Sequence, residues 1–339
     1  MIRIGKFTDF YSDVTKMGTK IPQERYLSKG QFPIIDQGRQ TIAGRWDDED
    51  GIFSDVPAIV FGDHTRAIKY IEEPFFIGAD GVKILRPKNT QDSPKYLFYA
   101  LQAARIPDLG YSRHFKAVKE LDIRVCSKEE QAEIVRILES IDFLIEKRHE
   151  EVRYLDQAVK SRFIELFGDP IDNTMGLKTI PLGEACFLKA GITTAADAIH
   201  EQSAVYPVPC YGGNGIRGYV KEATQHGCYP IIGRQGALCG NVQMATGEFH
   251  ATEHAVLVTP LIETNVVWLF HLLRMMDLYR FHTGAAQPGL AVKTLNTVDI
   301  PIAEIAVQNN FASFVEQTDK SKLCGMMEAV SYTHLTLPT

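Results

Sequence analysis

The sequence predicts an α+β protein built from two tandem copies of one domain, joined by long helices. Residues 76–87 align without a gap onto residues 249–260. Both segments start with Phe, carry an acid at the fifth position and end with Pro. Between the copies, residues 128–166 carry apolar side chains at alternating spacings of four and three, which is typical of a coiled-coil helix. We therefore expect two like domains related by approximate two-fold symmetry, held together by coiled-coil-forming helices.

The rest of the chain supports the duplication. Upstream of the aligned segment, residues 32–34 match 206–208; downstream, residues 122–123 match 299–300. The offset between matched residues drifts only from 171 to 177, so the two copies share the order of their elements while their loops differ. A duplicated body of this kind suits a bipartite partner, and double-stranded DNA is a common one.

Apolar runs and turn signals give each copy the same expected elements. Strands are expected where apolar runs meet turns, and a helix should follow the second strand of each copy. The expected strands are 58–61 and 81–85 in the first copy and 229–232 and 255–258 in the second; the expected helices are 94–104 and 265–276. A Gly-rich polar loop follows each helix.

The segment between the copies has the signals of a complete helix. Ser127 and Glu130 form a capping box before it, and Gly168 and Pro170 follow its end. The second copy opens a similar helix at Gln308, but its pattern weakens after residue 324 and the last nine residues carry no charge. The expected segments are domain 1–126, spacer helix 127–169, domain 170–302, truncated spacer helix 303–330 and a non-native tail 331–339.

Composition and charge limit the classes of protein. The 339 residues are 45% hydrophobic and 23% charged, as in ordinary soluble proteins, and no apolar run is long enough to span a membrane. Six Cys without a paired CxxC motif indicate reduced thiols, and no secretory leader is apparent at Met1, so we expect a cytoplasmic protein. The net charge is −6, yet residues 1–126 carry 19 Lys and Arg against 17 Asp and Glu. A DNA-binding role would therefore need a partner that supplies further positive charge.

Two motifs suggest chemistry only weakly. Residues 213–218 read GxGxxG, but no convincing helix follows them and the first copy lacks the motif, so a Gly-rich turn is the better interpretation than a nucleotide site. Cys228 and Cys239 near His226 could hold zinc, although zinc ligands are usually closer and paired. Neither metal ligands nor a catalytic constellation are predicted.

The remaining candidates are polar side chains in loops at matching places of both copies. Arg, Asn and Gln suit contacts with base edges, and Lys suits phosphates. The candidate DNA-binding residues are Arg39, Arg45, His64, Arg66, Lys69, Arg113, His114, Lys116, Asn214, Arg217, Lys221, Arg234, Gln235 and Gln287. Unlike loops on a repeated scaffold imply two unlike half-sites.

With these features the chain resembles the specificity subunit (HsdS) of type I restriction–modification systems. The resemblance rests on the tandem copies and on the order of short motifs at 127–134, 166–170, 180–184, 231–236, 284–290 and 300–301. It implies that each copy is a target recognition domain and that the helices pair as an antiparallel spacer. It also implies a non-catalytic subunit that assembles with methyltransferase and restriction subunits, which would bind S-adenosylmethionine, ATP and Mg²⁺ in its place.

Two other classes of function stay open at this point. One is an enzyme that binds a phosphorylated small molecule in its Gly-rich loops, which would need a titratable group beside those loops in both copies. The other is a protein-interaction scaffold with no role on DNA.

Overall fold

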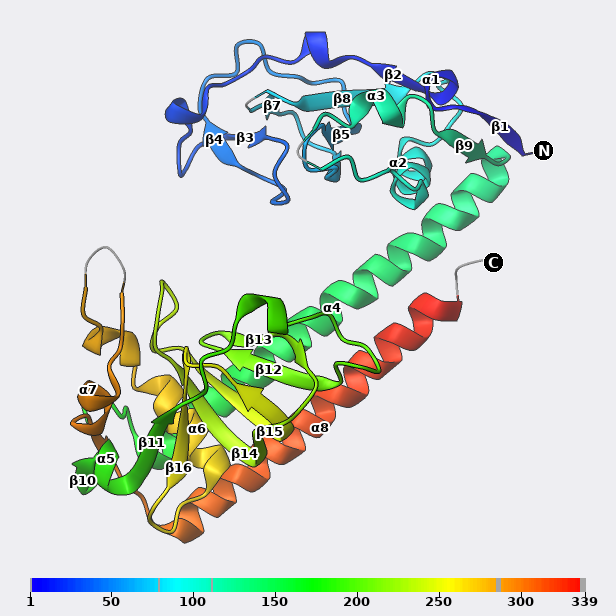
Figure 1. Cartoon of the computed structure of the whole chain (residues 1–339). Coiled ribbons are helices and arrows are strands. Elements are labelled where there is room, and N and C mark those ends of the chain that lie inside the picture. The colour runs from blue at the N-terminus through cyan, green and yellow to red at the C-terminus, as the bar shows by residue number, and fades with distance from the viewer. Residues whose placement is uncertain (1, 79, 111, 285–287, 336–339) are drawn as a thin grey trace. The chain divides into compact units, whose positions relative to one another are not determined.

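The computed structural model describes residues 2–78, 80–110, 112–284 and 288–335, with the backbone alone described for residues 324–335 (Figure 1). The chain divides into unit 1 (Met1–Leu144) and unit 2 (Ile145–Thr339). Helix α4 (Lys128–Phe167) crosses this boundary, so each unit contains one part of it. Among the described residues, no helix is both long and apolar enough to cross a membrane.

Unit 1 consists of short strands and helices arranged in three sheets. Strand order is β2-β8-β5-β6 in the largest sheet, β4-β3-β7 in the second, and β1-β9 in a separate pair. In chain order its elements before α4 are β1 (Arg3–Lys6), α1 (Phe7–Phe10), β2 (Tyr11–Asp13), β3 (Phe32–Ile35), β4 (Gly44–Trp46), β5 (Ala58–Gly62), β6 (Ile68–Ile71), β7 (Phe76–Ile77), β8 (Val82–Pro87), α2 (Pro94–Ala103), α3 (Phe115–Val118) and β9 (Asp122–Val125). The fully buried apolar run of β5 makes it a central strand, with β6 on one side and β8 on the other.

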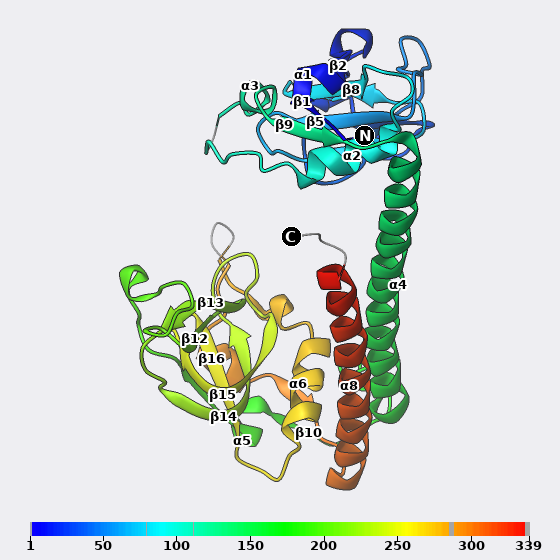
Figure 2. The same cartoon turned by 90° about the vertical axis from the view of Figure 1, so that its right-hand side faces the viewer.

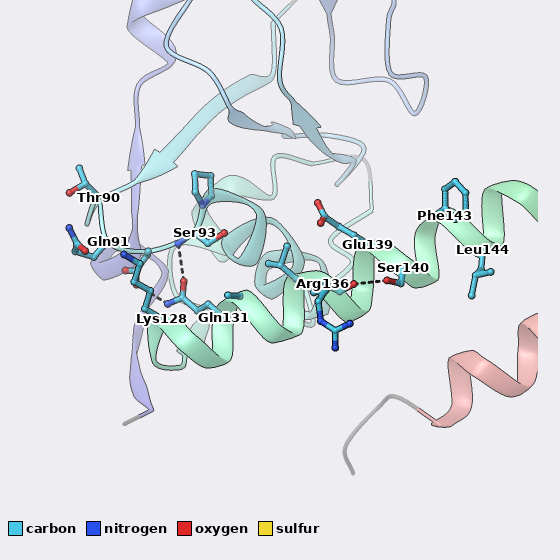
Figure 3. A pocket seen from close by; sticks show the side chains of 14 residues that line it. Thr90, Gln91, Ser93, Lys128, Gln131, Arg136, Glu139, Ser140, Phe143 and Leu144 are labelled. Carbon is cyan, nitrogen blue, oxygen red and sulfur yellow. Dashed lines mark hydrogen bonds between the residues drawn. The ribbon is translucent and has the colours of Figure 1, made fainter.

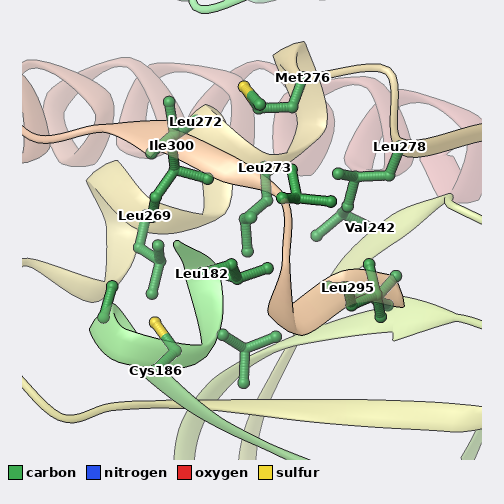
Figure 4. Close-up of a cluster of buried hydrophobic side chains, with 14 of the residues drawn as sticks. Leu182, Cys186, Val242, Leu269, Leu272, Leu273, Met276, Leu278, Leu295 and Ile300 are labelled. Atoms are coloured by element: carbon green, nitrogen blue, oxygen red, sulfur yellow. The ribbon is translucent and has the colours of Figure 1, made fainter. Parts of the chain in front are cut away.

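Unit 2 has a six-stranded sheet in the order β11-β16-β14-β15-β12-β13 and a separate pair of β10 and β17. Its elements after α4 are β10 (Thr179–Pro181), α5 (Leu182–Ala185), β11 (Cys186–Ala190), β12 (Val208–Gly212), β13 (Gly215–Val220), β14 (Gln225–Gly233), β15 (Val242–Ala251), β16 (Ala255–Pro260), α6 (Val266–Met275), α7 (Val292–Asn296), β17 (Asp299–Pro301) and α8 (Ile305–Leu335). Leucine, isoleucine and valine side chains from α5, α6, α7 and the sheet meet in one core (Figure 4).

The order of elements in unit 2 repeats that of unit 1, which confirms the prediction of tandem α+β domains. In both units the first and last strands form an isolated antiparallel pair, β1 with β9 and β10 with β17. The rare parallel contact also recurs, between β3 and β7 and between β12 and β15. One difference is that the single strand β15 takes the place of β6 and β7, so the two larger sheets of unit 1 correspond to one continuous sheet in unit 2.

Helix α4 begins and ends where its sequence signals predict. The Ser127 backbone N–H donates to Glu130 Oε2 at 2.9 Å and the Glu130 N–H donates to Ser127 Oγ at 3.4 Å, which is the reciprocal pattern of a capping box. At the other end Gly168 takes a φ of +73°, a left-handed conformation that glycine adopts freely after a helix. The helix contains 40 residues.

Within unit 2, the last turns of α4 pack antiparallel against α8 (Figure 2). The rings of Phe163 on α4 and Phe311 on α8 lie 5.4 Å apart, and both side chains are fully buried. Toward the other end of the contact, Lys322 on α8 pairs with Asp156 on α4 at 2.7 Å. Helix α8 continues to Leu335, five residues beyond the expected end at residue 330, and residues 336–339 lie outside the described residues.

The partial burial of His271 in unit 2 predicts a pH-dependent stability. Burial lowers the pKa of His271 to about 4; Arg274 and Lys322 lower it further, while Asp319 and Asp156 oppose them. Because the folded pKa is depressed, the neutral side chain contributes stability that is fully present above the unfolded pKa near 6.5 and is lost as the pH falls toward 4. The loss should approach about 3 kcal/mol at pH 4.

Urea unfolding of the wild type and of His271→Leu at pH 7.5 and pH 5 tests this expectation. The wild type should lose about 2 kcal/mol more than the variant over this interval. Carboxylates elsewhere titrate equally in both proteins, so the difference between them isolates this side chain. His226→Leu is the matched control, because His226 lies on the exposed part of β14. Equal pH dependence in wild type and His271→Leu would contradict the assignment.

Candidate nucleic-acid interface

In unit 1 the turn after β5 is the point where three loops meet. The backbone N–H of Asp63 donates to the carbonyl of Gly81 at 2.7 Å, which ties this turn to the one before β8. The carbonyl of Asp63 accepts from the backbone N–H of His114 at 2.9 Å, which ties it to the loop before α3. The Asp63 carboxylate is buried and accepts from the backbone N–H of Phe115 at 2.7 Å. Its role is therefore to fix the loops in place.

Unit 2 repeats the same backbone framework with different side chains. The backbone N–H of Arg234, after β14, donates to the carbonyl of His254 at 3.0 Å, and the carbonyl of Arg234 accepts from the N–H of Leu290 at 2.8 Å. These two bonds are equivalent to those of Asp63 in unit 1, with His254 in the place of Gly81 and Leu290 in the place of His114. Since only the backbone is repeated, each unit presents three loops at equivalent places with unlike side chains.

Glycine allows a fourth loop to pack against this turn in each unit. A Cβ atom on Gly62 would lie 2.6 Å from the carbonyl oxygen of Gln37, and a Cβ on Gly233 would lie 2.0 Å from that of Gly213. Neither glycine has a positive φ, so glycine is required here for space. The loop after β3 and the turn after β12 are thus held against the end of the central strand.

The acid conserved between the two copies also has a structural role. Asp80 pairs with Lys20 at 2.5 Å, and this hydrogen bond from the Lys20 ammonium lowers the pKa of the Asp80 carboxyl. In unit 2, Glu253 Oε2 accepts from the backbone N–H of Thr194 at 3.1 Å. In unit 1 the acid thus links the turn before β8 to the segment that follows β2. In unit 2 it links the turn before β16 to the segment that follows β11.

Among the candidates in unit 1, those that reach solvent lie in the joined loops or beside them. Arg39, Arg113 and Lys116 are exposed, on the loop after β3, the loop before α3 and α3 itself. Arg66 is partly buried and has a φ of +60°; its Nη2 donates to Asp108 Oδ2 at 2.7 Å, which joins the turn after β5 to the loop after α2. His64 is also partly buried, on the same turn.

Three further candidates of unit 1 direct polar atoms to the protein itself. Lys69 is only 7% exposed and its Nζ donates to the Asp36 carbonyl at 2.8 Å; burial lowers its pKa, and Asp36 opposes this effect. His114 is 1% exposed and its Nδ1 lies 2.9 Å from the Asp63 carbonyl. Arg45 lies in β4 and contacts the Gln31 carbonyl at 3.4 Å. The burial of Lys69 and His114 argues against the predicted contacts with DNA, because desolvated groups with internal partners cannot reach a phosphate or a base.

In unit 2, most candidates stay exposed around the corresponding loops. Asn214, Arg217, Lys221 and Gln235 are exposed, on β13, the turns beside it and the turn after β14. The Asn214 Oδ1 accepts a hydrogen bond from Asn241, a residue that the sequence did not single out. Gln287 lies outside the described residues.

Arg234 is partly buried, and its Nε is enclosed with no hydrogen-bond acceptor among the described residues. Buried donors normally have an acceptor, so this guanidinium retains a donor for a ligand or for water. Its backbone is fixed by the framework described above.

The structure shows where the residues of the two weak motifs lie. Residues 213–218 form the turn between β12 and β13 and the first part of β13, so the GxGxxG pattern belongs to a hairpin and not to a helix N-terminus. Cys228 is exposed while Cys239 is buried on another segment. In the described part of the chain, no three His, Cys, Asp or Glu residues are grouped as metal ligands would be.

Comparison with known proteins identifies the first of the repeated domains. Residues 6–154 match the type I restriction modification DNA specificity domain. The type I restriction enzyme EcoprrI specificity subunit of Escherichia coli is 39% identical over 194 residues, which are 56% of this chain and 48% of that protein. The chain thus spans about half the length of this curated relative.

A solved structure supports the fold over the full length. The S subunit of a type I restriction-modification system from M. genitalium superposes with a TM-score of 0.59 at 17% sequence identity, covering 99% of this chain and 94% of that one. Residues 6–154 are thus similar to the type I restriction modification DNA specificity domain, and about half of the chain is similar in sequence to a type I restriction enzyme specificity subunit.

Proposed function

We propose that this chain is the sequence-reading and scaffold subunit of a type I restriction–modification complex. Residues 1–126 and 170–302 serve as two target recognition domains, each reading one half of a bipartite sequence in double-stranded DNA. The spacer is formed by residues 127–169 and 303–330, and residues 331–339 form a tail outside the functional parts. The observation that carries the proposal is the repeated backbone framework, which holds loops of unlike sequence at equivalent places in both units.

Partner subunits supply the chemistry in this proposal. Methyltransferase subunits bind S-adenosylmethionine and methylate a flipped adenine, and restriction subunits bind ATP and Mg²⁺. This chain has no catalytic role and works in the cytoplasm, where the DNA is. An enzyme acting through the framework loops would need the same titratable group in both units, but Asp63 in unit 1 corresponds to Arg234 in unit 2. The phosphate contacts of the complex would come largely from the partners, because the chain itself has a net charge of −6.

The exposed or partly exposed cations and amides of the framework loops are the residues expected to meet DNA. They are Arg39, His64, Arg66, Arg113, Lys116, Asn214, Arg217, Lys221, Arg234, Gln235 and Gln287, with Gln287 proposed from sequence alone. Lys69 and His114 are left out because they are buried, and Arg45 because it lies in β4 and not in a framework loop.

Mapping of methylated adenines tests the proposed function directly. The chain is expressed with the methyltransferase subunit encoded beside it, in a host without adenine methylation of its own. We expect methylation within a split, asymmetric sequence with a fixed unread gap. Methylation at a continuous motif would overturn the proposal, as would methylation by the methyltransferase subunit alone at the same sites.

Arg234→Ala is expected to relax base preference in one half-site only. A bidentate Arg contact contributes about 1–3 kcal/mol of discrimination at one base pair, so methylation of targets altered at that position should rise by about tenfold relative to the cognate target. Methylation rates on duplexes with single changes in each half-site measure this. Lys178→Ala, at the exposed residue before β10 and outside the framework loops, is the control and should match the wild type. Equal weakening on every duplex would instead assign Arg234 to a phosphate.

A further inference from the structure

Each long helix carries one buried glutamine in its first turn. Gln131 is the fourth residue of α4 and Gln308 the fourth of α8, and their exposed fractions are 2% and 1%. Buried amides are costly unless both the oxygen and the nitrogen find partners. The partners of these two amides show what each helix is attached to.

Gln131 joins α4 to the start of α2 (Figure 3). Its Oε1 accepts from the backbone N–H of Ser93 at 2.8 Å, and its Nε2 donates to the carbonyl of Cys126 at 3.0 Å and to Asp92 Oδ1 at 3.0 Å. Ser93 is the N-cap of α2 and uses its own side chain to accept from Tyr96 N–H. The glutamine therefore links the backbone N–H of the α2 N-cap to the carbonyl of Cys126, two residues before α4.

Gln308 makes the same contact in unit 2. Its Oε1 accepts from the backbone N–H of Asn265 at 2.8 Å, and its Nε2 donates to the carbonyl of Ala303 at 2.8 Å. Asn265 is the N-cap of α6, the counterpart of α2. The contact thus recurs at the same place of both copies, which shows that it belongs to the repeated architecture.

The two helices differ in what else attaches them. In unit 2, Phe311 and Val315 of α8 are buried in the apolar core. Among the described residues of unit 1, Val135 is the apolar residue of α4 that packs against the core around α2, and it is only partly buried. The other attachments of α4 there are polar, from Tyr99 Oη to Asp142 Oδ2 at 2.7 Å and from Lys95 to Glu139 at 3.7 Å.

An open groove adjoins the Gln131 contact. It has a volume of about 990 Å³ and is lined by residues 90–94 and by the exposed side of α4 between residues 128 and 144 (Figure 3). Side chains along that part of α4 remain exposed, with Phe143 at 56% and Leu144 at 46%. On this side, apolar packing therefore does not fix the orientation of α4 relative to the rest of unit 1. Its orientation depends on hydrogen bonds.

We propose that Gln131 fixes the direction in which α4 leaves unit 1, and that it thereby selects the length of the unread gap between the two half-sites. Gln131 is a positioning residue in this role, and Gln308 is not, because apolar packing holds α8 without it. The inference rests on the proposed function. One base pair more or less in the gap shifts a half-site by about 3.4 Å and about a tenth of a turn, so a small change in helix direction is sufficient to alter the choice.

The test uses the chain in complex with its methyltransferase subunit and a set of duplexes. The duplexes carry the cognate half-sites separated by the native gap and by gaps one or two base pairs shorter or longer. Gln131→Met keeps the length of the side chain but leaves the Ser93 N–H and the Cys126 carbonyl without their partner. We expect its preference for the native gap to fall about tenfold, which corresponds to the worth of one or two hydrogen bonds, while base preference within each half-site stays unchanged.

Two variants serve as controls for the same substitution. Gln308→Met removes the equivalent contact in unit 2 and should keep the native gap preference, although it lowers stability. Gln317→Met changes an exposed residue of α8 and should match the wild type throughout.

A second test variant, Tyr99→Phe, removes only the hydroxyl that donates to Asp142. It should shift the gap preference in the same direction as Gln131→Met.

The outcomes separate this inference from the proposed function. An unchanged gap preference in Gln131→Met overturns the inference, as does a loss of base preference in the first half-site at the native gap, because Gln131 would then only support the fold of unit 1. If Gln131→Met does not assemble, Tyr99→Phe decides, and an unchanged gap preference there overturns the inference. If the wild type methylates no bipartite target, the proposed function itself fails.

Discussion

Phe311→Ala is expected to lower the free energy of unfolding of unit 2 by about 4 kcal/mol. The Phe311 side chain is fully buried, and its ring lies 5.4 Å from that of Phe163 and 5.7 Å from that of Phe167, both on α4. On the α6 side its ring lies 5.3 Å from His271. Truncation would leave a cavity where three helices meet, and the rigid aromatic neighbours cannot collapse to fill it.

Equilibrium unfolding in urea, followed by far-ultraviolet circular dichroism, measures the loss. Leu323→Ala on the same helix is the control, because Leu323 is 59% exposed; its effect should stay within about 0.5 kcal/mol. Phe311→Leu keeps an apolar side chain in the cavity and should fall between the two. A loss under about 1 kcal/mol for Phe311→Ala would contradict the role of this residue in joining α4 to α8.

The apolar stripe of α4 shows how far sequence periodicity predicts the fold. The positions of the stripe between Leu138 and Leu166 are half-buried or buried, as the spacing of four and three predicts, whereas Ile134 is 37% exposed. Phe163 and Phe167 were not predicted as core residues. They lie beside the stripe, on the face that meets α6 and the sheet of unit 2, and no local pattern reveals a second buried face on a helix.

The buried candidates show where the prediction of the site fails. As a lysine, Lys69 is predicted from sequence to contact a phosphate, but it lies on the inward face of β6. Its partner Asp36 lies 33 residues away in sequence, so only the folded chain brings the two together. His114 is likewise predicted from its residue type and its loop as a contact with DNA, and it is buried. Residue type predicts what a side chain can bind, whereas exposure is decided by long-range packing.

The framework that positions the loops has almost no side-chain signature. It consists of backbone hydrogen bonds made by residues as unlike as Asp63 and Arg234. The two units therefore repeat these bonds without repeating the residue types that make them. The only sign of the framework in the sequence is a glycine, Gly62 or Gly233, shortly after the expected strands 58–61 and 229–232. The alignment of the two copies nevertheless places both glycines at the end of the same buried strand. The position of the loops can therefore be predicted from sequence, whereas most of the hydrogen bonds between them cannot.

Gly233→Ala is expected to abolish base preference in the second half-site while sparing the first. The new Cβ would lie 2.0 Å from the carbonyl oxygen of Gly213, so one of two backbone segments has to move. Overpacking of this kind costs about 1–3 kcal/mol of stability. The displacement separates the turn after β12 from the turn after β14, and both carry residues proposed to read DNA. Methylation of duplexes altered in one half-site at a time measures the effect, alongside a thermal unfolding curve.

The other copy and a neighbouring glycine provide matched controls for this prediction. Gly62→Ala places its Cβ 2.6 Å from the Gln37 carbonyl oxygen and should impair the first half-site only. Gly289→Ala lies in the same cluster of loops as Gly233 but brings its Cβ no closer than 3.8 Å to its neighbours, so it should behave like the wild type. Opposite effects of Gly233→Ala and Gly62→Ala would show that each unit reads its own half-site through the same framework. If either variant weakened both half-sites equally, the loops would not be independent readers, and the assignment of one half-site to each unit would have to be abandoned.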